Sequence, residues 1–86
     1  MILLKGGQGY TIDDSIEVIG AQNSLEGVAA EYDYLSQRFG KRNEDWTLVS
    51  QALVMQDERF FDKLSLSLKN NESVDIFFDI TGFFLP

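Results

Sequence analysis

The sequence predicts a two-layer α+β domain, in which one helix packs on a mostly antiparallel sheet. Two runs near the C-terminus, 64–68 and 74–80, alternate apolar and polar residues with the period of two that is typical of strands. One stretch, 23–40, carries its apolar residues at the 3.6-residue period of a helix. With two further strand-like stretches, these patterns predict the order strand, helix, strand, strand, strand. All 86 residues are expected to form a single domain, residues 1–86.

The N-terminal residues 1–5 form a short apolar run, which is a candidate for an additional edge strand. The segment 6–9 that follows is rich in glycine. It contains neither the P-loop pattern nor the dinucleotide-binding pattern, so a phosphate site is not favoured. We interpret it as a turn, or as a loop whose backbone passes close to another element.

The first clear strand is expected at 15–20, where Ile16 and Val18 fall on the same face. It lies within a longer strand-like region, 10–21. An acidic group near its start does not have the spacing of a calcium loop, and we interpret it as a solvated turn. This group consists of Asp13, Asp14 and Glu17.

Residues 23–40 contain the predicted helix. Asn23 is a suitable cap for the first turn, with Glu26 in the capping-box position, and Gly40 suits the left-handed conformation that ends many helices. Basic residues near the C-terminal end of this helix interact favourably with the helix dipole. Their position therefore does not require an anionic ligand. The predicted apolar stripe consists of Leu25, Val28, Ala29, Tyr32, Leu35 and Phe39, and the basic residues are Arg38, Lys41 and Arg42.

Residues 46–56 are predicted to form a strand because they are rich in β-branched and aromatic side chains. Apolar residues occur at both parities, with Val49 and Leu53 on one and Leu48 and Val54 on the other. This pattern is typical of a central strand that is covered on both faces, and a helix is the alternative that it leaves open.

The two C-terminal runs are predicted to pair as an antiparallel hairpin, because the segment 69–73 between them is polar and rich in turn formers. Directly opposed residues share a face of the sheet. A two-residue turn at Asn70 and Asn71 would put the two apolar rows on opposite faces, so we expect a loop of three or five residues, or an equivalent bulge. The expected register places Leu68 opposite Val74, Leu66 opposite Ile76 and Leu64 opposite Phe78.

A single helix covers one face of the sheet, so the other face is expected to be open. Phe77 should lie there between Asp75 and Asp79, with Phe61 close by. The two carboxylates would be about 13 Å apart along the strand, too far to share a metal ion. An aromatic side chain between carboxylates instead suits a contact patch for a basic protein. The predicted partner-binding residues are Phe61, Asp75, Phe77 and Asp79, and no catalytic or metal-binding residue is predicted.

The apolar groups on this open face need a cover. A second copy of the chain, a different protein, or the chain's own C-terminal tail would each provide one. The tail, 82–86, contains the apolar segment from Phe83 to Pro86. The sequence leaves these three alternatives open.

The composition argues against several kinds of chemistry. The chain has no cysteine, which excludes disulfides and thiolate metal sites and fits a reducing compartment, and no histidine, the commonest general base. Its formal net charge of -7 works against nucleic acid as a ligand. No apolar run is long enough to span a membrane, and the N-terminus does not have the pattern of a signal peptide. We therefore predict a cytoplasmic protein without a cofactor.

These observations predict a small, acidic, non-enzymatic protein-binding module, such as an inhibitor or an immunity-type protein for a basic partner. The alternative is a structural homodimer, or a small-ligand-binding module, that packs through the open sheet face. An enzyme would need a site built from carboxylates alone, because the sequence contains no nucleophile motif.

Overall fold

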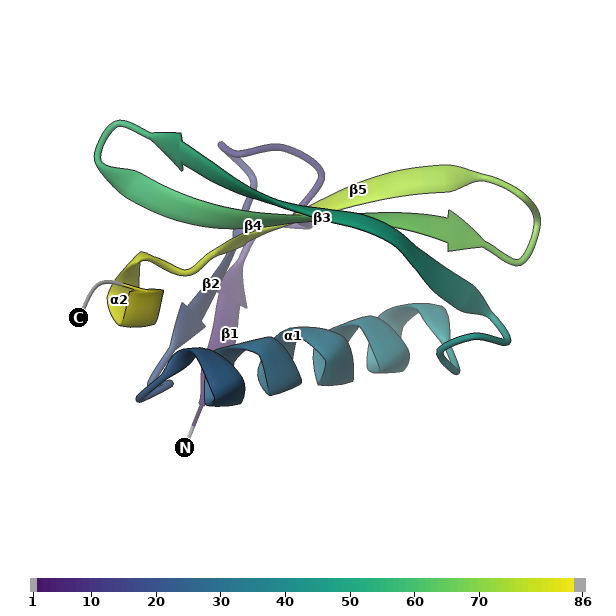
Figure 1. The fold of residues 1–86 in the computed structure, drawn as a ribbon, viewed down its shortest axis with the longest axis horizontal. Coiled ribbons are helices and arrows are strands. Elements are labelled where there is room, and N and C mark those ends of the chain that lie inside the picture. Colours follow the sequence, from purple (N-terminus) through teal and green to yellow (C-terminus); the bar gives the residue numbers. More distant parts are fainter. Residues whose placement is uncertain (1, 85–86) are drawn as a thin grey trace.

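A computed structural model describes residues 2–84 and shows one helix packed on a five-stranded open sheet (Figure 1). The fold class is confirmed, and so is the additional N-terminal strand. Three of the four strand pairs are antiparallel, and the pair of β2 and β5 is parallel, in the order β1-β2-β5-β4-β3. The elements are β1 (Leu3–Gly6), β2 (Ile16–Ile19), α1 (Ser24–Phe39), β3 (Trp46–Gln56), β4 (Arg59–Leu68), β5 (Ser73–Asp79) and α2 (Thr81–Phe84).

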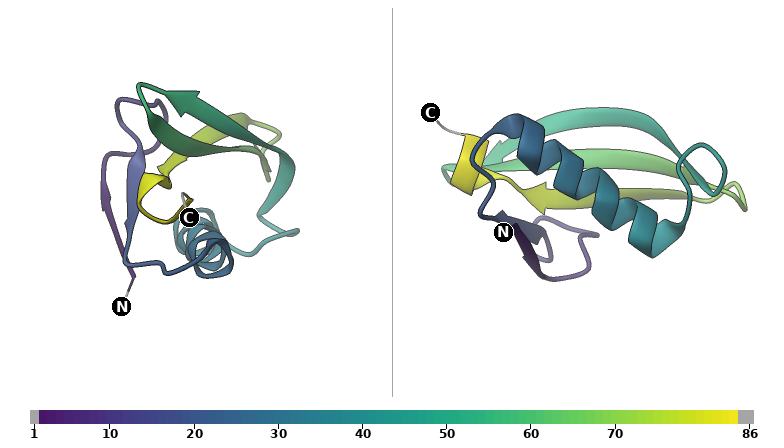
Figure 2. Two further views of the ribbon diagram at one scale, coloured as in Figure 1. Left: turned by 60° about the vertical axis from the view of Figure 1, so that its left-hand side comes forward. Right: turned by 90° about the horizontal axis from the view of Figure 1, so that it is seen from below.

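The sheet is strongly twisted and curves around α1, as the left view of Figure 2 shows. The core lies on this concave side. Because β2, β5 and β4 are the three inner strands, their concave-side residues are the most deeply buried. They join one residue of α1, one of β3 and Ile80, which directly follows β5, in a single cluster. It consists of Ile16, Val18, Leu35, Trp46, Leu64, Leu66, Ile76, Phe78 and Ile80.

The glycine-rich segment makes a close backbone approach, which is the second of its two interpretations from the sequence. The loop between β1 and β2 runs beside β5, where the N–H of Phe77 donates to the carbonyl oxygen of Gly9 over 2.6 Å. Gly9 has a φ of 86°, and a Cβ there would lie 2.9 Å from side-chain atoms of Ile16 and Ile76. Only glycine fits this position without displacing the core.

The hairpin of β4 and β5 has its apolar rows on one face, as predicted, but its register differs by two residues. Leu64 lies opposite Ile76 and Leu66 opposite Val74. The physical reason is a three-residue loop, in which the N–H of Leu68 donates to the carbonyl oxygen of Glu72. Asn71 closes this loop with a φ of 69°, a conformation that asparagine tolerates better than most residues.

The prediction that residues 46–56 form a central strand covered on both faces is wrong. Within residues 2–84, β3 is the edge strand and pairs with β4 alone. Trp46 is buried, but Val49, Leu53 and Met55 are largely exposed. A bulge between Leu48 and Ser50 shifts the register, which explains why apolar residues occur at both parities without both faces being covered.

Both predicted ends of α1 are confirmed, but its buried face is not the predicted stripe. The side chain of Asn23 accepts from the N–H of Glu26, and the N–H of Gly40 donates to the carbonyl oxygen of Ser36. The fully buried residues are Gly27, Glu31 and Leu35, whereas Leu25 is 82 % exposed. The helix is therefore rotated about its own axis, relative to the predicted orientation, by about the 100° that separates consecutive residues.

The C-terminal tail packs on the side of the sheet that holds α1. Phe83 of α2 packs against the core cluster, and its ring lies over Gly27, so close that a Cβ there would be 2.2 Å from the ring. Residues 81–84 therefore do not cover the opposite face. Residues 85 and 86, which the tail prediction also included, lie outside the described residues.

Candidate functional site

The four predicted partner-binding residues lie on one sheet face, opposite α1. Phe61 pairs with Asp79, Lys63 with Phe77 and Ser65 with Asp75. Their exposure differs sharply, because Phe61 is 1 % and Asp79 4 % exposed, whereas Asp75 is open to solvent. The predicted grouping is therefore present, with Asp75 and the half-buried Phe77 as its accessible members.

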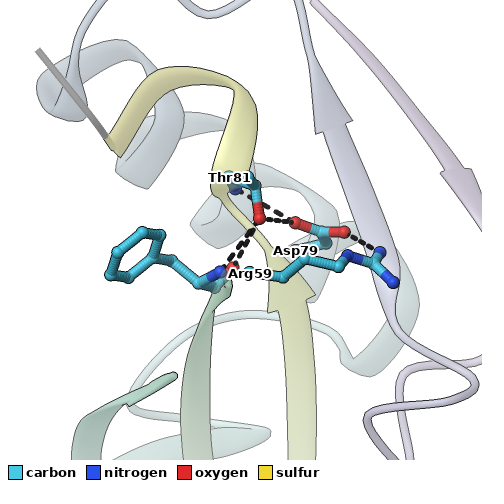
Figure 3. Close-up of polar contacts among 4 residues, drawn as sticks. Arg59, Asp79 and Thr81 are labelled. Atoms are coloured by element: carbon cyan, nitrogen blue, oxygen red, sulfur yellow. Dashed lines mark hydrogen bonds and ion pairs between the residues drawn. The ribbon is translucent and has the colours of Figure 1, made fainter. Parts of the chain in front are cut away.

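Asp79 is held by the start of β4 and the start of α2 (Figure 3). It forms an ion pair with Arg59 and accepts from the N–H and hydroxyl of Thr81 over 3.0 and 2.7 Å. Thr81 in turn accepts from the N–H of Phe60 over 2.9 Å. Burial alone would raise the pKa of Asp79, but the hydrogen bonds from Thr81 and the pair with Arg59 outweigh it and lower that pKa. The Asp79 side chain therefore links β5 to the start of β4 and to the start of α2.

Asp75 also has a basic neighbour. The Ser65 hydroxyl donates to its Oδ1 over 2.7 Å, and the Lys63 Nζ lies 3.8 Å from its Oδ2. The same Nζ lies 6.0 Å from the centre of the Phe77 ring. Both aspartates of this face thus stand beside a cation, which makes the face less negative than the sequence suggested.

The exposed edge of β3 is a second candidate surface, which the sequence reasoning missed. β3 spans eleven residues and contains no charged residue and no proline. Its outward N–H and C=O groups have no neighbouring strand among the described residues. Long uncharged edges are uncommon because they accept further strands. The absence of charged residues from 46–56 was the sequence signal that this strand could form an edge able to pair with another strand.

A third candidate lies between α1 and β4. Glu31 is 0 % and Asp62 8 % exposed, and the two side chains are within hydrogen-bonding reach of each other. No described residue donates to either oxygen of Glu31. Burial raises the pKa of Glu31 to about 9, and the nearby Asp62 carboxyl adds to the rise. Asp62 alternates with Leu64 and Leu66 along the same strand. The sequence pattern could therefore have predicted that Asp62 faces the core.

A cavity of about 190 Å³ opens onto Asp62. Its apolar wall comes from α1, from the end of β5 and from α2, and its polar lining comes from β3, β4 and the start of α1. The lining residues are Ser24, Val28, Gln51, Asp62, Ile80, Phe83 and Phe84.

Comparison with protein families, with curated proteins and with solved structures found no match for this chain.

The basic residues near the end of α1 are engaged within the fold. The Arg38 guanidinium donates to the Tyr34 hydroxyl over 3.0 Å and to the carbonyl oxygen of Gln8, and it lies 4.8 Å from the Tyr10 ring centre. The Arg42 guanidinium lies 4.6 Å from the ring centre of Tyr32. These contacts support the interpretation that the cluster is structural.

Within the acidic group near the start of β2, Asp14 has a similar local role. Asp14 accepts from the N–H of Gln8 over 3.0 Å, which closes the loop between β1 and β2. Within residues 2–84, no group of three or more acidic, histidine or cysteine side chains is placed to hold a metal ion. No helix of the described part is long and apolar enough to cross a membrane.

Proposed function

We propose that this chain is a non-enzymatic protein-binding module that pairs an extended segment of its partner with the open edge of β3. The observation that carries the proposal is the strand itself, with eleven residues, no charge and, beyond a bridge at Trp46, an edge that no other strand of the described chain occupies. Strand addition obtains affinity from main-chain hydrogen bonds and specificity from alternate side chains.

Side chains beside this edge supply apolar contacts on both faces. Leu53 and Met55 pair with Asp62 and Phe60 and lie on the side of α1, and both are exposed. Val54, at the other parity, lies on the opposite side next to Phe61. An added strand would therefore find apolar neighbours on either face of the sheet.

The charge of the chain favours a basic partner. A net charge of -7 attracts a basic protein over long range and speeds its encounter, while the uncharged β3 makes the contact. An inhibitor or immunity-type protein that blocks a basic enzyme would combine these two features. Such binding weakens as salt rises, mainly through a lower association rate.

A second copy of the chain is the alternative partner, and the composition of β3 favours it. Antiparallel pairing of two β3 strands about Leu53 would bring the two Leu53 side chains together and set Gln51 beside Met55 of the other copy. No like charges would meet along this edge, despite the acidity of each copy.

Matched lysine variants test the proposal. Leu53→Lys places a charge beside the β3 edge, whereas Leu25→Lys changes an exposed leucine on α1. A partner that co-purifies with the wild type should stay bound to Leu25→Lys and be lost from Leu53→Lys. If the partner is a second copy, sedimentation should show a dimer that Leu53→Lys alone dissociates. Retention of the partner by Leu53→Lys would overturn the proposal.

A further inference from the structure

The buried pair of Glu31 and Asp62 has no structural partner that explains it. Carboxyl groups are rarely buried unless a cation or several donors satisfy them, because desolvation of the charged form is costly. Glu31 lacks any donor among the described residues. Asp62, its one charged neighbour, is itself an acceptor when ionised, so the two share a hydrogen bond only when one is protonated.

The cavity beside this pair has the chemistry of a site for a cation with an aliphatic chain. Asp62 is at its polar end, whereas Val28, Ile80 and Phe83 form an apolar wall. Its volume of about 190 Å³ suits one long side chain or a small organic molecule. A metal ion fits less well, because two carboxylates supply fewer oxygen ligands than calcium or magnesium requires.

We propose that this cavity binds an alkylammonium group, with its aliphatic chain against the apolar wall and its charged nitrogen at Asp62, whose carboxyl lies within hydrogen-bonding reach of Glu31 behind it. The ammonium donates hydrogen bonds to the Asp62 carboxyl and places a positive charge next to Glu31, whose oxygens accept from no described donor. Its charge favours the ionised form of Glu31, so binding releases the Glu31 proton to solvent. The cavity touches β3 only through Gln51, and the proposed binding does not require a strand to pair with the β3 edge, so it does not depend on the function proposed above.

The other groups around the cavity do not titrate in the neutral range. β3 contributes Gln51, and the end of β5 and α2 contribute Ile80, Phe83 and Phe84. Asp62 is the one charged group that shifts the pKa of Glu31. Proton release on binding therefore reports on the carboxyl pair itself.

The probe is n-butylammonium, titrated into the ¹³C- and ¹⁵N-labelled protein and followed by NMR. We expect the largest shifts at Asp62, Glu31 and Phe83, and the carboxyl ¹³C signal of Glu31 should titrate at lower pH when the amine is present. Neutral n-pentanol, of similar length, should bind about tenfold more weakly because it lacks the charge. Equal binding of the two probes, or no binding of the amine, would overturn the proposal.

Conservative variants test whether n-butylammonium binds at the pair of Glu31 and Asp62. Asp62→Asn and Glu31→Gln keep the shape of each side chain and should each weaken n-butylammonium binding about tenfold or more. Asp33→Asn, an exposed change on α1, should leave it unchanged. An equal loss in all three variants would overturn the site, and the amide spectrum of each variant checks that it is folded.

A second probe distinguishes the source of the ammonium. Nα-acetyl-lysine methylamide carries the same group on a peptide backbone. If it binds as well as n-butylammonium, the site accepts a lysine side chain from a protein. If only the free amine binds, the site is assigned to a small-molecule amine.

Discussion

Glu31 of α1 and Asp62 of β4 lie within hydrogen-bonding reach of each other, both at least nine-tenths buried. Two carboxyls in such a position cannot both ionise without a large cost. Glu31 therefore keeps its proton in the folded protein, and this relationship makes stability depend on pH.

Stability should fall as pH rises from about 4.5 to about 9. Glu31 has a pKa of about 9 in the folded protein and 4.5 ordinarily, so between these values the folded state binds more protons than the unfolded state. The contribution of Glu31 is complete below pH 4.5 and is lost as pH approaches 9. The slope should reach at most about 1.4 kcal/mol per pH unit. Urea unfolding at several pH values measures it, and a stability that stays level or rises over this range would contradict the assignment.

Replacement of Glu31 by methionine should remove that slope and stabilise the protein at neutral pH. An apolar side chain of similar length needs neither a proton nor a donor, and such replacements of buried charged groups are worth about 1–4 kcal/mol. The control Asp33→Asn, on the exposed side of α1, should keep the wild-type slope. An unchanged slope in Glu31→Met would show that another group titrates.

Much of the fold follows from local sequence patterns, and the differences have definite physical causes. Alternation at Leu64, Leu66 and Ile76 is sufficient to predict the hairpin and its shared face, because that face is deeply buried. Periodicity treats Glu31 as a solvent-facing residue, whereas the fold buries it against Asp62. The rotation of α1 could not be predicted for that reason. The orientation of the helix that buries Glu31 also turns Leu25 toward solvent.

The candidate sites depend on relationships that one sequence does not display. Alternation correctly placed Phe61 and Asp79 on the face opposite α1. It could not show that Arg59 and Thr81 would occupy the Asp79 carboxylate, because those contacts depend on the end of β5 meeting the start of β4. Likewise, whether β3 is central or at the edge is decided by strand order, which alternation does not determine.

Asp79→Asn should destabilise the protein by about 1–3 kcal/mol, because Arg59 and Thr81 lose a charged acceptor in a buried position. Asp75→Asn, at the exposed end of the same face, should change stability by less than about 0.5 kcal/mol. The lowered pKa of Asp79 stabilises the wild type above its ordinary value of 3.8, and this contribution is lost as pH falls through the lowered pKa. The Asn variant should therefore lose less stability on acidification. Equal effects of the two substitutions in urea unfolding would contradict a structural role for Asp79.

Gly27→Ala should destabilise the protein although alanine is the better helix former by about 1 kcal/mol. The added Cβ would lie 2.2 Å from the Phe83 ring, so this ring would have to leave its place against Gly27 and the core. Overpacking of this kind costs about 1–3 kcal/mol. Gly27→Ala combined with Phe83→Leu should show a smaller loss than the two single changes summed, and simple additivity in thermal unfolding would contradict the contact.

Asp75→Lys decides whether the sheet face opposite α1 takes part in partner binding. Pairing at the β3 edge leaves Asp75 outside the contact, so this variant should weaken binding only through the changed net charge. Asp13→Lys, in the exposed loop before β2, changes the net charge equally and is the matched control. Association and dissociation rates of both variants should agree within about twofold, with the effect confined to association. Faster dissociation of Asp75→Lys alone would place Asp75 and Phe77 inside the interface, because loss of a direct contact acts on the bound state.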